Sequence, residues 1–157
     1  MMLSAPGPLY QPEAVAQELP GGARSAYRVL IVDDRPELRG LLRARLNSEP
    51  DIEVVGEAGD GEEAVRLTRV LAPSAVLLDL EMPVMRGDEA IPLMREAAPG
   101  MGILLYTGAA QILLANGSAP DVIVGKGAPL TEVVAQLRAL LERTRPEAMH
   151  VAVSASA

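Results

Sequence analysis

Cysteine is absent from the sequence. This excludes a disulfide framework, a zinc site built on thiolates and a cysteine nucleophile, and it fits a reducing compartment. Basic runs are absent too, and the chain has a formal net charge of -7 and a pI near 4.7. A protein that binds the phosphate backbone of nucleic acids needs a positively charged surface. We therefore expect no direct DNA binding.

Long apolar stretches are also missing. No run approaches the roughly 20 residues that span a bilayer, and the amino terminus lacks the basic-then-apolar order of a signal peptide. We expect no membrane insertion and a soluble, cytoplasmic protein. Hydrophobic residues nevertheless make up 49% of the 157 residues, which is enough for the core of one compact domain.

The two ends of the chain differ in composition from its middle. Residues 1–26 mix prolines with glycines, a composition that interrupts regular structure, so we expect a mobile extension there. A regular pattern begins at Tyr27 and ends near Arg143, which predicts one domain over residues 27–143. Residues 144–157 carry no core pattern, and we expect a C-terminal tail.

Apolar runs of strand length alternate with segments of helical spacing throughout this domain. The expected strands are Tyr27–Val32, Ile52–Ala58, Ala75–Leu78, Met101–Thr107 and Val122–Val124. Each strand is followed by a helical pattern. This order predicts an α/β fold, a doubly wound five-stranded parallel sheet with helices on both faces.

Three of the expected helices have features that a structure can test. Asp60 and Glu63 have the spacing of a capping pair at the start of the second helix. Its expected inner face consists of Ala64, Leu67, Val70 and Leu71. Thr131 is expected to cap the last helix, which should end near Arg143. Residues 109–115 allow only about two helical turns, so we expect a shortened fourth helix.

Acidic residues directly follow two of the predicted strands. Asp79 ends one apolar run, and Asp33 and Asp34 end another. Burying an unpaired carboxylate costs several kcal/mol, so Asp79 must be paired, metal-bound or exposed in a crevice. In a parallel sheet of this kind, ligands bind at the carboxyl ends of the strands. The sequence therefore predicts a site with oxygen ligands at that edge.

Two further strands end in a hydroxyl and an amine, on Thr107 and Lys126. Alone, a threonine there is usually a local cap and a lysine a solvated charge. Together with the acids they predict a phosphoryl-transfer site. Asp34 and Asp79, with Asp33 behind them, suit Mg²⁺, and a carboxylate can act as a nucleophile that forms an acyl phosphate. Lys126 would neutralise phosphoryl oxygens, and Thr107 would donate a hydrogen bond to one of them.

From about Arg28 to Arg143 the sequence resembles the receiver domain of two-component response regulators, which has a CheY-like, flavodoxin-like fold. The resemblance rests on Val29–Asp34, on Leu77–Pro83 with Gly87 after it, on Thr107, and on Lys126 in Lys126–Pro129.

The resemblance implies a role for each of these polar positions. Asp79 would be phosphorylated by a histidine kinase or a histidine phosphotransfer protein. Asp33, Asp34, Asp79 and the backbone carbonyl of Glu81 would hold Mg²⁺, and Thr107 and Lys126 would contact the phosphoryl group. Ile123 departs from the pattern, because receivers usually carry Tyr or Phe three residues before the lysine. The segment between Thr107 and Lys126 is also short.

Three hypotheses follow. In the first, the chain is a single-domain response regulator, not an enzyme, that passes its phosphoryl group or its phosphorylated shape to a separate downstream protein. In the second, suggested by Ile123 and the short segment, it is an interaction module whose output does not need phosphorylation. In the third it is an aspartate-nucleophile phosphatase. That signature has a second aspartate where Glu81 stands, and its nucleophile lies early in the chain, unlike Asp79.

Overall fold

The computed structural model describes residues 26–108 and 119–144. Within these ranges the strands are β1 (Tyr27–Val32), β2 (Ile52–Ala58), β3 (Ala75–Leu78), β4 (Gly102–Thr107) and β5 (Val122–Gly125). The helices are α3 (Pro36–Asn47), α4 (Gly61–Leu71), α5 (Gly87–Ala97) and α6 (Leu130–Arg143). The shortened fourth helix that we expected over residues 109–115 lies outside the described residues, as do most residues of the two expected tails.

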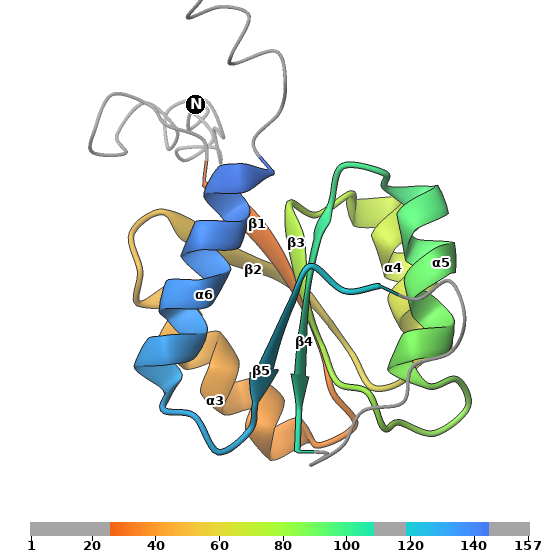
Figure 1. Cartoon of the computed structure of the whole chain (residues 1–157), viewed down its shortest axis with the longest axis horizontal. Helices are drawn as coiled ribbons and strands as arrows, with labels where there is room; N and C mark the ends of the chain where they lie inside the picture. Colours follow the sequence, from red (N-terminus) through yellow and green to blue (C-terminus); the bar gives the residue numbers. More distant parts are fainter. Residues whose placement is uncertain (1–25, 109–118, 145–157) are drawn as a thin grey trace, which may run out of the picture.

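All five strands are parallel and lie in the order β2-β1-β3-β4-β5. Helices α3 and α6 cover one face of the sheet, and α4 and α5 cover the other (Figure 1). The predicted doubly wound, flavodoxin-like fold is confirmed. Because the strands are parallel, their carboxyl ends meet along one edge of the sheet, and the polar residues that follow them are brought together there.

Two hydrophobic cores explain why the strands read as uninterrupted apolar runs. Neighbouring residues of a strand point to opposite faces of the sheet. Ile31 and Leu104 therefore join the core under α3 and α6, whereas their neighbours Leu30 and Leu105 join the core under α4 and α5. A strand buried on both faces has no polar positions to alternate with.

The start of α4 confirms the predicted capping pair. The Asp60 carboxylate accepts a hydrogen bond from the backbone N of Glu63 at 2.8 Å, and the Glu63 carboxylate accepts one from the backbone N of Gly59 at 3.2 Å. The expected inner face was partly wrong, because Val70 is 68% exposed. The fully buried positions are Gly61, Ala64, Val65 and Thr68. They recur at the three- and four-residue spacing of one helical stripe, and Val70 lies off it.

Helix α6 begins earlier than we expected. Its N-cap is Pro129, with φ -65° and ψ 153°, and not Thr131, which lies inside the first turn. Proline has no N–H group and is disfavoured inside a helix, which fits the position of Pro129 at the boundary. The predicted end at Arg143 is confirmed, as is the buried stripe of Val134, Leu137, Leu140 and Leu141.

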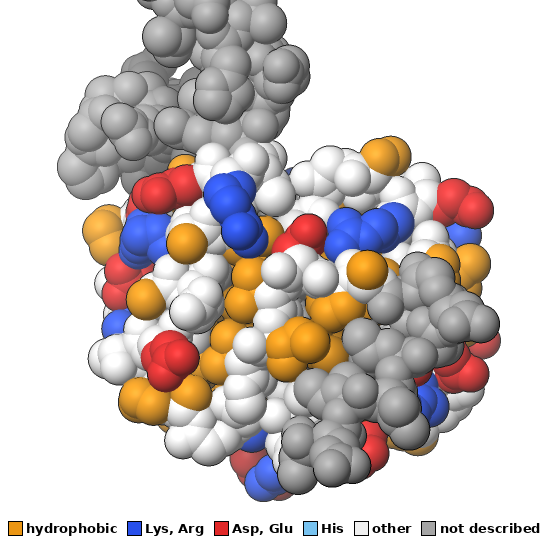
Figure 2. All heavy atoms as spheres, in the orientation of Figure 1, with side chains coloured by type: hydrophobic (Ala, Val, Ile, Leu, Met, Phe, Trp, Pro, Cys, Tyr) orange, Lys and Arg blue, Asp and Glu red, His pale blue; other side chains and the backbone are white. Residues whose placement is uncertain are grey.

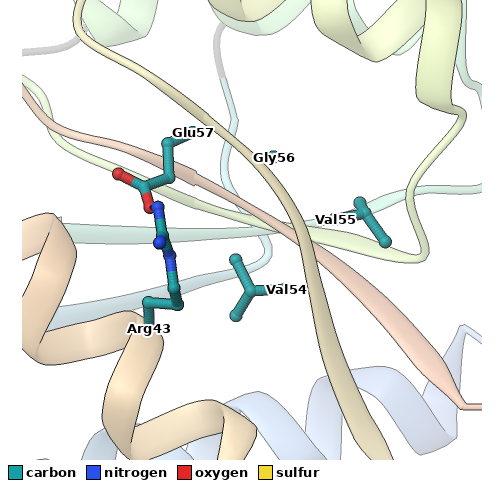
Figure 3. A pocket seen from close by; sticks show the side chains of 5 residues that line it. All are labelled: Arg43, Val54, Val55, Gly56 and Glu57. Atoms are coloured by element: carbon teal, nitrogen blue, oxygen red, sulfur yellow. The ribbon is translucent and has the colours of Figure 1, made fainter.

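The edge strand β2 borders a hollow of about 340 Å³, lined by Arg43, Val54, Val55, Gly56 and Glu57. Figure 3 shows Arg43 reaching from α3 to the Glu57 carboxylate, with which it forms an ion pair. Nearby, the Asn47 side chain accepts a hydrogen bond from the backbone N of Val54 at 3.0 Å. Charged and polar side chains of this kind protect a sheet edge from pairing with another chain. We therefore attribute the side chains around this hollow to the protection of the β2 edge.

Candidate functional site

The three acids lie together at the carboxyl ends of β1 and β3. These strands are neighbours, with Val32 paired to Leu78, so the acids that follow them start from adjacent positions. The backbone N of Asp79 donates to the carbonyl oxygen of Val32 at 2.9 Å. Carboxylate oxygens of Asp33, Asp34 and Asp79 all lie within 4.8 Å of one another. The structure thus brings together the acids that the sequence placed at two strand ends.

Lys126 reaches the acids from the end of β5. Its Nζ lies 2.7 Å from Oδ2 of Asp33 and 3.2 Å from Oδ2 of Asp79. Its backbone N donates to the carbonyl oxygen of Thr107 at 2.8 Å, which joins the ends of β5 and β4. Lys126 is also the only lysine in the chain. A lone lysine directly after a strand is a further signal for the site, beyond the motif that contains it.

Burial and neighbouring charges shift the pKa values of Asp79 and Lys126. Burial raises the pKa of Asp79, the negative charge of Asp33 raises it further, and Lys126 offsets these effects only in part. For Lys126, burial lowers the pKa, but the hydrogen bond to Asp33 and the charges of Asp79 and Asp33 outweigh it, so the pKa is raised. The ammonium group of Lys126 therefore stays charged, but it offsets only part of the effect that burial and Asp33 have on the pKa of Asp79.

Asp33 supports the site from behind. It is 2% exposed, and each carboxylate oxygen already accepts a hydrogen bond: Oδ1 from the backbone N of Arg35 at 2.9 Å and Oδ2 from Lys126. Arg39 donates to the Asp33 carbonyl oxygen at 2.6 Å. Asp34, by contrast, is exposed. Asp33 is thus held in place, and of the three aspartates Asp34 and Asp79 line the pocket.

The pocket itself has a volume of about 320 Å³. It is lined by Asp34, Arg35, Asp79, Glu81, Thr107, Gly108 and Lys126. With the exception of Asp33, which lies beneath it, every site residue predicted from the sequence lines this one pocket. Oxygen donors from carboxylates are the ligands that Mg²⁺ prefers, and Mg²⁺ is usually held by one or two of them. The donor set therefore fits this ion.

The loop from β3 to α5 folds back tightly against Asp79. The backbone N of Gly87 donates to the carbonyl oxygen of Leu80 at 2.8 Å, and a Cβ atom at Gly87 would lie 2.0 Å from the carbonyl oxygen of Asp79. Only glycine fits there. Val84, in the same loop, has φ 69° and is 75% exposed. A β-branched residue rarely adopts this left-handed conformation, so the loop is strained at Val84.

Tyr106 is a residue of the site that the sequence pattern did not reveal. It lies within an apolar run, which predicted only that it belongs to a strand. In the structure it is 5% exposed, and the Nζ of Lys126 lies 5.9 Å from the centroid of its ring. The sequence does contain one signal for this role: Tyr106 is the one aromatic residue of its strand and stands directly before Thr107.

A family model for the response regulator receiver domain matches residues 29–119. The chain belongs to this family. The receiver is similar to protein-glutamate methylesterase/protein-glutamine glutaminase 3 of Myxococcus xanthus, with 44% identity over 84 residues, which are 54% of this chain and 23% of that protein. It is also similar to the nitrate/nitrite response regulator protein NarL of Escherichia coli, with 39% identity over 79 residues, 50% of this chain and 37% of NarL.

Among solved structures, the receiver is similar to the response regulator domain of Thermotoga maritima CheB. The TM-score is 0.64 at 29% identity, and the match covers 76% of this chain and 98% of that one. By contrast, the chain spans only 23% and 37% of the length of the two curated relatives. Within residues 26–108 and 119–144, none of the helices combines the length and the apolar character of a transmembrane span.

Proposed function

We propose that this receiver accepts a phosphoryl group on Asp79 from the phosphohistidine of a histidine kinase or a histidine phosphotransfer protein. The observation that carries the proposal is the position of Lys126, whose ammonium group lies between Asp33 and Asp79 at 2.7 and 3.2 Å. A cation fixed beside a buried carboxylate is suitably placed to contact the oxygens of a phosphoryl group that is transferred to it.

The transfer is a displacement at phosphorus. A carboxylate oxygen of Asp79 forms a bond to the phosphorus atom, the bond from phosphorus to the histidine nitrogen breaks, and its electron pair stays on the imidazole, which leaves. The product is an acyl phosphate. Lys126 contacts one phosphoryl oxygen through its ammonium group, and the Thr107 hydroxyl donates a hydrogen bond to another. The pairing of β4 with β5 fixes the backbone at both positions, so the two side chains start from adjacent strand ends.

Bound Mg²⁺ would supply positive charge against the phosphoryl oxygens. Asp34 and Asp79 would hold it together with the backbone carbonyl of Glu81, and Asp33 would support them from behind. The raised pKa of Asp79 supports a need for this second cation. The shift reflects burial and repulsion from Asp33, which Lys126 offsets only in part. A dianionic donor that approaches these acids meets further repulsion, which a second cation reduces.

We infer that residues 27–143 are the receiver, with residues 1–26 and 144–157 as flanking segments. The output of the receiver would be a contact with a separate protein. The β5 edge supports this, because Ile123 is 48% exposed there, and Figure 2 shows hydrophobic side chains gathered on the face that carries β4 and β5. An exposed apolar area of this kind is typical of an interaction surface.

A second candidate is an interaction module whose output does not need phosphorylation. It is favoured by Ile123, which is stiff at χ1 and has no polar end. Such a side chain cannot alternate between buried and exposed positions as the usual aromatic residue does. The two candidates share the fold and differ in whether a phosphoryl group on Asp79 changes partner binding.

The deciding experiment is intact mass spectrometry after incubation with Mg²⁺ and acetyl phosphate. The wild type should gain the mass of one phosphoryl group, and Asp79→Asn should gain none. Glu37→Gln, an exposed acid in the first turn of α3, is the matched control and should behave as the wild type. Undiminished labelling of Asp79→Asn would refute the assignment. A wild type that takes no phosphoryl group from acetyl phosphate or from a phosphohistidine donor would favour the interaction module.

A further inference from the structure

Tyr106 lies behind the ammonium group of Lys126. It is the second-last residue of β4 and pairs with Val124 of β5, two residues before Lys126. The ring belongs to the hydrophobic core under α3 and α6, which also contains Val124 and Leu137, and only 5% of the residue is exposed. The ring is therefore held in place by close packing on the interior side of the site.

Lys126 needs such support, because its side chain is long and flexible. Its ammonium group is attracted by Asp33 and Asp79, yet 19% of the side chain is exposed, so water can compete for it. The ring centroid of Tyr106 lies 5.9 Å from Nζ, within the range at which an aromatic face attracts a cation. Burial raises the pKa of Tyr106, so the phenol stays neutral and acts through its ring.

We propose that Tyr106 is a positioning residue, whose aromatic ring keeps the ammonium group of Lys126 directed at the carboxylate of Asp79 and, after transfer, at the acyl phosphate. The second part rests on the proposed function. In this chain the aromatic residue beside the site stands on β4, directly before Thr107, and the aliphatic Ile123 stands on β5. The ring thus acts on the lysine itself, whereas Ile123 is on the surface.

The first test is NMR spectroscopy of Lys126 without any phosphodonor. Because the chain has one lysine, labelling the protein with ¹³C-lysine makes the side-chain methylene signals of Lys126 directly assignable. The ring current should shift these signals in the wild type and in Tyr106→Phe, and the shift should disappear in Tyr106→Leu. Tyr27→Leu removes a tyrosine at the opposite end of the sheet and should leave them unchanged. Signals that are the same in Tyr106→Leu and the wild type would overturn the proposal.

The second test is a double-mutant cycle on the rate of phosphorylation by acetyl phosphate at saturating Mg²⁺. Tyr106→Leu should slow the rate by about two- to fivefold, as expected for loss of one cation–π contact. Tyr106→Phe should restore most of it. In a Lys126→Ala background the same Leu substitution should have no further effect, because the residue that Tyr106 positions is gone. An equal loss in that background would show a merely structural role and refute the proposal.

The two tests distinguish a failure of this inference from a failure of the proposed function. If the wild type takes no phosphoryl group, the proposed function fails, and the NMR comparison alone decides whether Tyr106 positions Lys126. Thermal unfolding should confirm that each variant is folded. If Tyr106→Leu does not fold, Tyr106→Met replaces it as an unbranched side chain without a ring.

Discussion

The Nζ of Lys126 lies 2.7 Å from Oδ2 of Asp33, a residue 93 positions earlier in the chain. The two residues follow β5 and β1, strands that are not neighbours in the sheet. Each strand supplies only one partner of this contact, so neither strand can form it alone. The site therefore forms only when β1 and β5 are both in place in the sheet, so the stability of the domain and the chemistry of the site are linked.

Removing this cation should destabilise the protein. Lys126→Ala leaves the carboxylates of Asp33 and Asp79 without the ammonium group, and breaking a buried ion pair costs about 3–5 kcal/mol. Since 19% of the lysine side chain is exposed, we expect a smaller loss of about 1–3 kcal/mol in urea unfolding. Arg66→Ala, which removes an exposed ion pair with Glu63, is the control and should cost less than about 1 kcal/mol. Equal losses in the two variants would contradict the prediction.

Asp79→Asn should stabilise the protein at neutral pH in the absence of divalent cations. The pKa of Asp79 is raised in the folded state, first by burial and then by Asp33. A raised pKa means that stability is greatest below the unfolded pKa and falls as pH rises through the folded pKa. The amide carries no charge and avoids this loss. Melting temperatures in chelator should therefore be higher for Asp79→Asn at pH 7, and the difference should shrink near pH 4.

The same comparison with Mg²⁺ gives a control. The ion should raise the melting temperature of the wild type more than that of Asp79→Asn, because it adds positive charge beside the carboxylate. A wild type that is at least as stable as Asp79→Asn at pH 7 in chelator would show that Lys126 neutralises Asp79 completely.

Asp34 should contribute most to Mg²⁺ binding. Both oxygens of Asp33 already accept hydrogen bonds from Arg35 and Lys126, whereas Asp34 is exposed at the pocket. We expect Asp34→Ala to weaken Mg²⁺ binding by roughly tenfold or more in titration calorimetry. Glu37→Ala removes another exposed acid and should have little effect. Phosphorylation should also stop in excess chelator, and phosphorylation that continues there would contradict the proposed role of the metal.

Gly87→Ala should destabilise the loop that carries Asp79. The added Cβ atom would lie 2.0 Å from the carbonyl oxygen of Asp79, so the backbone must move, at a cost of about 1–3 kcal/mol. The matched control is Gly40→Ala inside α3, where nothing lies within 4 Å of an added Cβ. There alanine should instead stabilise the helix, by about 0.5–1 kcal/mol. Urea unfolding of both variants measures the contrast, and equal effects would refute it.

Val84→Gly should relieve strain in the same loop. Val84 has φ 69°, a conformation that costs a residue with a Cβ roughly 1–2 kcal/mol. Its side chain is 75% exposed, so little burial is lost. Glycine also adds freedom to the unfolded chain, and we expect a net gain of up to about 1 kcal/mol. Val70→Gly is the control: Val70 is also exposed, but it lies in α4, so glycine should destabilise the helix.

Features set by burial and chain direction could be predicted from the sequence. The strands were readable because a run buried on both faces must be apolar throughout, and the strand order placed Asp33, Asp34 and Asp79 at one edge. The phase of a helix was harder to predict. In α4 apolar residues occur on more than one stripe, and only packing against β2 and α5 decides that Val65 is buried and Val70 is not.

Other features depend on geometry that no single segment determines. The contact of Tyr106 with Lys126 requires the register of β4 against β5, and the positive φ of Val84 occurs in a loop that ends with Gly87 against the Asp79 carbonyl oxygen. At the start of α6, two local signals competed. Thr131 is a residue type that favours the cap position, but Pro129, which is disfavoured inside a helix, stands at the boundary.

Because Lys126 is the only lysine of the chain, amine-directed labelling has one side-chain target, and it lies in the site. The carboxylates that hold its ammonium group also keep it protonated and thus unreactive. A ligand that draws these carboxylates away would change the labelling rate of this residue alone. The rate of acylation at Lys126, read from one peptide, would therefore report a change in the contacts of the site.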